Sequence, residues 1–172
     1  MNIKEETQGF DISNKSCCLI GCGGLGCNIA VHMVGAGIGQ IYLCDFDTVS
    51  ESNLNRQFLY TLNDIGKKKC LVMKERLCAY SLSTDYKAVN KKITSCGDLQ
   101  FASNCDIILC AVDNPESRSI IEKYCEENKK PMLCGGIDGF YGFAYLYVPD
   151  CSASPSQAVH IRKRFLSLSR LL

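Results

Sequence analysis

The sequence lacks several features that would each indicate a particular class of protein. It has no excess of charge, because its 172 residues carry 19 lysines and arginines against 18 aspartates and glutamates. This balance argues against nucleic acid or an anionic lipid surface as the partner. No stretch of 18 residues is free of charged or polar side chains, so we expect no segment that spans a membrane. Residues 1–10 carry charges ahead of any apolar run, unlike a signal peptide, and we therefore expect a cytoplasmic protein.

The sequence also has no CxxC pair, although it contains 13 cysteines. A structural zinc held by four thiolates is not expected without such pairs. An odd number of cysteines in a cytoplasmic chain indicates reduced thiols rather than a disulfide framework. With 47% apolar residues, the chain has enough hydrophobic surface to form one folded domain.

Short apolar runs alternate with amphipathic stretches along the chain. This alternation predicts an α/β fold of the Rossmann-like, doubly wound kind, with a mostly parallel sheet and helices on both faces. The expected strands are residues 16–20, 40–44, 85–89, 106–112, 131–134 and 143–148, with 135–142 as a glycine-rich connection. The expected helices are residues 25–33, 67–80 and 116–127, the last with Pro115 where the helix would begin.

The two ends of the chain differ from this pattern. We expect one domain over residues 1–150 and a divergent tail over 151–172. The tail contains basic residues beside several leucines, including Arg162, Lys163 and Arg164. We interpret it as a basic amphipathic helix on the domain surface or at a dimer interface.

The run GCGGLG at residues 21–26 follows an expected strand and precedes an expected helix. In that position Gly21, Gly23, Gly24 and Gly26 are typical of a loop whose backbone N–H groups approach a phosphate closely. Asp45 lies 19 residues after the last glycine, at the end of the second strand, where a carboxylate can accept hydrogen bonds from a ribose. The alternative is a glycine turn that serves only tight packing of strand against helix.

A dense polar segment follows the second strand. Arg56 can form a forked contact with phosphate oxygens, and Asn53 and Gln57 can orient them. Lys69 adds a second cation. Asp113 ends the fourth expected strand, and a carboxylate near phosphates is a natural magnesium ligand. These residues favour a triphosphate over a dinucleotide.

Five motifs occur together in one order over residues 16–148, and with them the sequence resembles the MoeB/ThiF/HesA family. This family comprises bacterial relatives of the adenylation domain of the ubiquitin-activating enzyme. The matching motifs are GCGGLG at 21–26, DFD at 45–47, SNLNRQF at 52–58, DIGKKK at 64–69 and VDNPESR at 112–118.

The resemblance implies an adenylyltransferase that uses ATP and Mg²⁺ to activate the C-terminal Gly-Gly carboxylate of a small ubiquitin-like sulfur-carrier protein. It also implies a homodimer. Carried over residue by residue, it assigns Gly23 and Gly24 to the nucleotide, Asp45 to the ribose and Asp113 to magnesium. Contacts with the phosphates are implied for Asn53, Arg56, Gln57 and Lys69. The implied catalytic residues are Arg56, Lys69 and Asp113.

The sequence departs from the family in two places, and these departures leave other functions open. Residues 1–16 contain no arginine, whereas family members commonly extend an N-terminal arginine to the neighbouring subunit. After the last strand only Cys151 stands where many members have two CxxC pairs for zinc. One alternative is a nucleotide-binding scaffold without catalysis. Another is an NAD-binding oxidoreductase, which the glycine loop and Asp45 alone would also fit.

Three polar residues of these motifs also have structural interpretations. Asp45 and Asp47 could cap the turn that follows the second strand. Arg118 could form an ion pair with Glu122 at helical spacing or contact the nucleotide.

Overall fold

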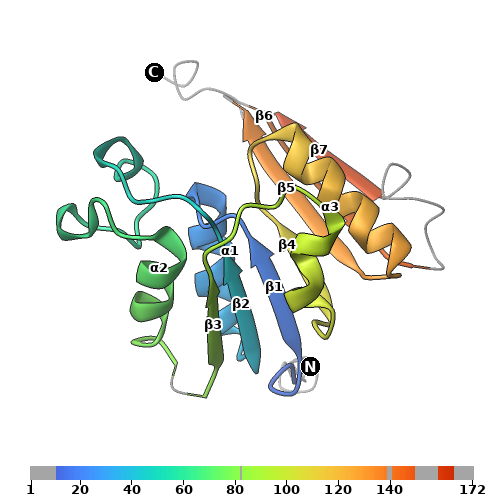
Figure 1. Ribbon diagram of the computed structural model, residues 1–172, viewed down its shortest axis with the longest axis horizontal. Helices are drawn as coiled ribbons and strands as arrows, with labels where there is room; N and C mark the ends of the chain where they lie inside the picture. The colour runs from blue at the N-terminus through green and yellow to red at the C-terminus, as the bar shows by residue number, and fades with distance from the viewer. Residues whose placement is uncertain (1–10, 82, 139–140, 150–158, 165–172) are drawn as a thin grey trace, which may run out of the picture.

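The sheet is built mainly from the short apolar segments of the sequence (Figure 1). The computed structural model describes residues 11–81, 83–138, 141–149 and 159–164. Within them the strands are β1 (Ser16–Ile20), β2 (Gln40–Cys44), β3 (Asp85–Val89), β4 (Ile107–Cys110), β5 (Met132–Asp138), β6 (Tyr141–Tyr147) and β7 (Val159–Arg164). Their order across the sheet is β3-β2-β1-β4-β5-β6-β7. Neighbours from β3 to β5 pair in parallel, whereas β6 and β7 add antiparallel pairs.

Helices cover both faces of this sheet. The α-helices are α1 (Gly24–Gly35), α2 (Lys69–Leu77) and α3 (Pro115–Glu127), and the 3₁₀ helices are η1 (Glu51–Asn53), η2 (Leu62–Asp64) and η3 (Cys96–Ala102). Leu19 belongs to a core that contains side chains of α1 and α2. Its neighbour Ile20 belongs to a second core that contains side chains of α3 and η3. Because successive strand residues point to opposite faces, the predicted doubly wound α/β fold is confirmed.

The strand order reverses between β1 and β4, which makes this position the topological switch point of the sheet. From β1 the chain continues to β2 and β3 on one side, and it later adds β4 and β5 on the other side. The loops after β1 and β4 therefore lead to opposite faces and leave a crevice between them. In open α/β sheets this crevice is where ligands bind.

Most predicted boundaries differ from the structure by one or more residues, and two of these differences have a clear cause. Helix α2 begins at Lys69 rather than at residue 67, because Lys67 and Lys68 pair with the turn after β2. The backbone N–H of Val49 donates to the carbonyl of Lys67, and Thr48 forms a bridge with Lys68. The glycine-rich segment 135–142 is mostly strand rather than connection, since Gly135 and Gly136 pair with residues of β6.

The prediction of a helix in the tail is wrong for residues 159–164, which form β7 along β6. Val159 and Ile161 alternate with His160 and Arg162, and a period of two favours a strand. Strand β6 also offers an edge for pairing, which a surface helix would leave unpaired. The rest of the predicted tail lies outside the described residues.

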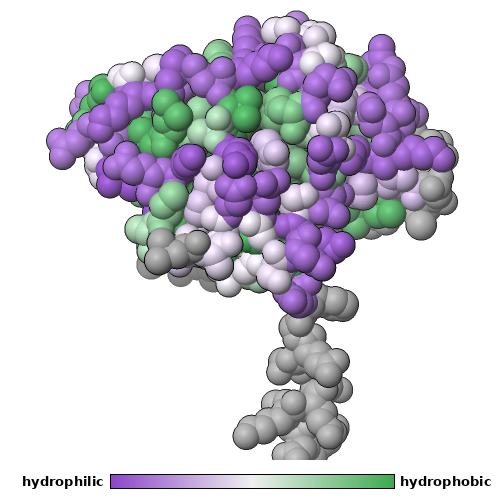
Figure 2. Space-filling model, turned by 60° about the horizontal axis from the view of Figure 1, so that its bottom comes forward, coloured by the Kyte–Doolittle hydropathy of each residue, from purple (hydrophilic) through white to green (hydrophobic). Residues whose placement is uncertain are grey.

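Hydrophilic side chains cover most of the face that the space-filling view presents, and hydrophobic ones show between them (Figure 2). Among the described residues, no helix combines the length and the apolar character that crossing a bilayer requires.

Candidate functional site

A cavity of about 1010 Å³ lies in the crevice at the carboxyl ends of β1 and β4. It contains almost every residue that the sequence assigns to a nucleotide site. The predicted residues that line it are Gly21, Gly23, Gly24, Asp45, Asn53, Arg56, Gln57, Lys69 and Asp113. Gly26 alone of the predicted set is not among its lining residues. Motifs that are up to 92 residues apart in sequence are therefore brought to one place.

The four glycines of the loop have two different roles. Gly21 has a φ of +99°, and a Cβ there would lie 2.6 Å from the carbonyl oxygen of Ala111. A Cβ on Gly26 would lie 2.0 Å from the carbonyl oxygen of Gly21, so Gly26 serves close packing of α1 against the loop. A Cβ on Gly23 or Gly24 would meet nothing closer than 3.4 Å. The open backbone at these two positions faces the cavity at the start of α1, where N–H groups attract anions.

Two side chains hold this loop from opposite sides. The carboxylate of Asp45 accepts a hydrogen bond from the N–H of Cys22 at 2.7 Å and another from the N–H of Asp47 at 2.8 Å. The buried hydroxyl of Tyr60 donates to the carbonyl of Cys22 at 2.7 Å. Burial raises the pKa of Tyr60, so its hydroxyl stays protonated and able to donate. Asp45 therefore caps the turn, as one interpretation of the sequence suggested, and also fixes the loop.

Gln57 and Arg56 follow η1 and form one wall of the cavity. Gln57 is 4% exposed, and its Oε1 has no hydrogen-bond partner in the described structure. Arg56 is exposed, and its Nη1 donates to the carbonyl of Ser52 at 3.0 Å and to Asn55 at 2.9 Å. Because a guanidinium has five donors, Arg56 keeps others for a ligand. A buried amide oxygen without a partner is costly unless something in the cavity satisfies it.

Lys69 is the most buried cation of the cavity, at 6% exposed. It is the first residue of α2, and its Nζ lies 3.1 Å from the carboxylate of Asp47. The backbone N–H of Lys69 also donates to the carbonyl of Asp47. The Asp47 carboxylate is thus the partner of a cavity cation, a role that the sequence interpretation of Asp47 as a cap of the turn missed.

Asp113 is exposed at the end of the segment that follows β4 and lines the cavity. No group of three or more His, Cys, Asp or Glu side chains in the described part of the chain could hold a metal by itself. A single free carboxylate fits magnesium that arrives on a nucleotide, because Mg²⁺ commonly takes one or two carboxylates with phosphate oxygens and water.

Two further cations line the cavity: Lys91, which the sequence interpretation did not single out, and Arg118, for which it left a nucleotide contact open. Lys91 lines it and pairs with Asp98 at 2.9 Å, a contact that holds the pKa of Asp98 well below its usual range. Arg118 lines it from the first turn of α3. Lys91 belongs to none of the five motifs, and only its place after an expected strand could have indicated it.

The chain matches the ThiF family over residues 2–163. It belongs to the ThiF family. It is 34% identical over 131 residues to a protein of Porphyra purpurea named "Probable molybdopterin-synthase adenylyltransferase", with 76% of this chain and 34% of that protein covered. It is 32% identical over 131 residues to the "Sulfur carrier protein ThiS adenylyltransferase" of Escherichia coli (strain K12), with 76% and 52% covered.

Among solved structures, this ThiF family chain is similar to E. coli MccB crystallised with ATP. The TM-score is 0.78 at 29% identity, and the match covers 83% of this chain and 43% of MccB. The chain thus spans about half the length, or less, of the relatives that it matches.

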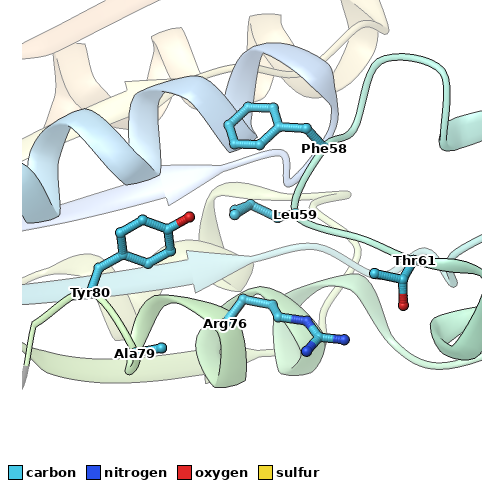
Figure 3. A pocket seen from close by; sticks show the side chains of 6 residues that line it. All are labelled: Phe58, Leu59, Thr61, Arg76, Ala79 and Tyr80. Carbon is cyan, nitrogen blue, oxygen red and sulfur yellow. The ribbon is translucent and has the colours of Figure 1, made fainter.

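A second, smaller hollow of about 380 Å³ lies between the end of α2 and the segment that follows η1 (Figure 3). Its lining residues are Phe58, Leu59, Thr61, Arg76, Ala79 and Tyr80. Its one charged side chain is Arg76, whose Nη2 donates to Asp64 at 2.9 Å. Figure 3 shows the guanidinium extending toward Thr61. With its cation already paired, this hollow offers no chemistry like that of the larger cavity.

Proposed function

We propose that this chain binds MgATP in the larger cavity and adenylates the C-terminal carboxylate of a small ubiquitin-like sulfur-carrier protein. The observation that carries the proposal is the buried cation Lys69 in the cavity that the open backbone of Gly23 and Gly24 also lines. Gln57 has an amide oxygen without a partner, and Lys69 is a buried cation beside a half-exposed aspartate. A triphosphate would offer oxygens to the ammonium of Lys69 and to the amide N–H groups of Gln57, whose own oxygen needs a donor and is not satisfied by phosphate.

The proposed nucleotide position follows from the lining residues. The phosphates would lie against the backbone of Gly23 and Gly24, within reach of Asn53, Arg56, Gln57 and Lys69. The ribose would lie at Asp45, whose oxygens retain acceptor capacity beyond their two backbone contacts. Asp113 would bind magnesium, which when bound neutralises charge on the phosphates.

The proposed reaction needs positioned cations rather than a general base. The carrier carboxylate is already ionised and attacks the α-phosphorus of ATP. A new carboxyl-oxygen-to-phosphorus bond forms, the bond from the α-phosphorus to the bridging oxygen breaks, and pyrophosphate leaves with that oxygen. Arg56 and Lys69 would stabilise the charge that develops on the transferring and leaving groups.

Partner, assembly and compartment are also part of the proposal. One relative is named as acting on the sulfur carrier ThiS, which supports a carrier of this kind as the substrate. The family resemblance supports a homodimer. All twelve cysteines in the described residues are free, which supports a reducing compartment such as the cytoplasm.

ATP–pyrophosphate exchange with the purified chain tests the reaction. The probe is a ubiquitin-like carrier ending in Gly-Gly, and the control is the same carrier with an amidated C-terminus. We expect exchange only with the free carboxylate, and a loss on the order of 10²–10³ in rate for Arg56→Ala. The matched control is Lys123→Met, which removes an exposed cation of α3 that does not line the cavity.

Two other outcomes would replace the proposal. ATP binding without any exchange would favour the non-catalytic scaffold. NAD binding with hydride transfer and no exchange would favour the oxidoreductase, although the relatives described above are named as adenylyltransferases.

A further inference from the structure

Arg118 does not form the ion pair with Glu122 that helical spacing suggested. Glu122, its partner at helical spacing, instead accepts a hydrogen bond from the hydroxyl of Tyr145 on β6. The guanidinium of Arg118 turns back toward the sheet, and its Nη2 donates to the carbonyl of Val112 at 2.8 Å. Its Nε is buried and has no partner among the described residues. The Arg118 guanidinium is therefore held by the backbone of Val112, in the segment that follows β4.

The carbonyl that Arg118 holds belongs to the residue directly before Asp113. On the other side of Asp113, the side chain of Asn114 caps α3 by accepting from the N–H of Ser117 at 2.7 Å. The backbone is thus tied on both sides of Asp113. Asp113 is itself exposed and lines the cavity, so these backbone contacts fix the position from which its carboxylate extends.

A ring on β6 fixes the guanidinium. The Arg118 Cζ lies 4.7 Å from the centroid of the Phe143 ring, a cation–π arrangement. Phe143 is opposite Gly136 in the pairing of β6 with β5. A Cβ on Gly136 would lie 2.5 Å from the Phe143 ring and 3.3 Å from the Arg118 Nη2. Because Gly136 has no side chain, it leaves the space in which the Phe143 ring and the Arg118 guanidinium meet.

We infer that Arg118, seated on Phe143 over Gly136, is a positioning residue that directs the Asp113 carboxylate toward the magnesium of bound ATP. The inference rests on the proposed function, because it requires Asp113 to bind that magnesium. It gives the antiparallel strand β6 a role in the nucleotide site. A planar guanidinium is needed at this position, because an ammonium cannot stack on the ring while reaching the Val112 carbonyl.

The test is the dependence of ATP affinity on Mg²⁺ concentration, measured by calorimetry without any carrier protein. For Arg118→Lys we expect the Mg²⁺ concentration at half-effect to rise by about 3- to 10-fold, with unchanged affinity for ATP in EDTA. Phe143→Leu should act in the same direction, because it removes the ring and leaves the charge. Lys123→Met, on the outer side of the same helix, should change neither quantity.

Asp113→Asn distinguishes a failure of the proposed function from a failure of the inference about Arg118. If Mg²⁺ dependence survives this change, Asp113 is not the magnesium ligand and that part of the proposed function fails. If Asp113→Asn removes the dependence but Arg118→Lys and Phe143→Leu leave it unchanged, the proposed function stands and the inference about Arg118 is wrong.

The double variant distinguishes positioning from direct phosphate binding. In the Asp113→Asn background, Arg118→Lys should cause no further loss of ATP affinity. A further loss there, or weaker ATP binding in EDTA for Arg118→Lys alone, would mean that Arg118 binds phosphate itself and would overturn the inference.

Discussion

The ammonium of Lys69 lies 3.1 Å from the Oδ2 of Asp47, with 8% of the lysine side chain exposed against 49% of the aspartate side chain. The backbone strengthens this pairing, since the N–H of Lys69 donates to the Asp47 carbonyl at 3.0 Å. A cation buried to this degree is stable only with an anionic partner. In the proposed complex a phosphate oxygen would contact the same ammonium, so Asp47 and the nucleotide share Lys69.

Asp47→Asn should lower stability and increase the stabilisation that MgATP gives. Without its carboxylate partner, Lys69 becomes an unpaired buried cation, at a cost of about 1–3 kcal/mol in the free energy of unfolding. Bound phosphate would then supply the missing anion. Thermal unfolding with and without MgATP measures both effects. Glu127→Gln, in an exposed ion pair of α3, should leave the rise in melting temperature caused by MgATP as in the wild type. If MgATP raises the melting temperature of Asp47→Asn by no more than that of the wild type, the shared contact is contradicted.

Lys69→Met should reduce pyrophosphate exchange by about 10²–10³ with little loss of stability. The fold tolerates the change because Asp47 is half-exposed and becomes hydrated. Lys67→Met is the matched control two residues away, since Lys67 pairs with Asp64 and does not line the cavity. Equal activity losses in the two variants would show that general charge, rather than the position of Lys69, matters.

Much of the site was predictable because its motifs follow strands that end at one edge of the sheet. The loop after β1, the polar segment after β2 and Asp113 after β4 were each assigned from the sequence, and the structure gathers them around one cavity. What spacing along the chain does not give is which neighbour a side chain meets. Helical spacing paired Arg118 with Glu122, but Tyr145, 23 residues further on, contacts Glu122 instead.

The same limit applies to the glycines and to the tail. A GxGxxG pattern does not distinguish Gly23, which leaves open space, from Gly26, which another backbone approaches. Leucines and basic residues in the tail as a whole favoured a helix. The period of two within residues 159–162 and the edge of β6, with which residues 159–164 pair, favour the strand instead.

Gly23→Ala should lower ATP affinity and leave stability nearly unchanged, whereas Gly26→Ala should lower stability. A methyl at residue 23 meets nothing closer than 3.8 Å, so stability should stay within about 0.5 kcal/mol of wild type. The same methyl would block phosphate from the backbone, and ATP affinity should fall at least about tenfold. A methyl at residue 26 would lie 2.0 Å from a carbonyl oxygen and should lower the melting temperature markedly. Calorimetry and thermal melts separate the two, and unchanged ATP affinity in Gly23→Ala would remove the loop from the phosphate site.

Asp64 should make stability depend on pH on the acid side. It is buried at the end of η2 and accepts hydrogen bonds from Arg76 at 2.9 Å, from the hydroxyl and N–H of Thr61, and from Lys67 at 3.1 Å. The Arg76 guanidinium, with the help of Thr61 and Lys67, holds the pKa of Asp64 well below its ordinary value of 3.8.

A carboxyl whose pKa is lowered by folding binds its proton first in the unfolded chain. Its contribution is therefore present above about pH 3.8 and is lost as pH falls through the lower folded pKa. Asp64→Asn should be less stable than wild type at pH 7, and this difference should shrink as the pH falls below about 4. Urea unfolding from pH 7 downward measures it, with Glu127→Gln as the exposed control that should show a small, flat difference. A difference for Asp64→Asn that stays constant down to the lowest pH would mean that the amide loses only hydrogen bonds, and that the charge of Asp64 does not stabilise the fold.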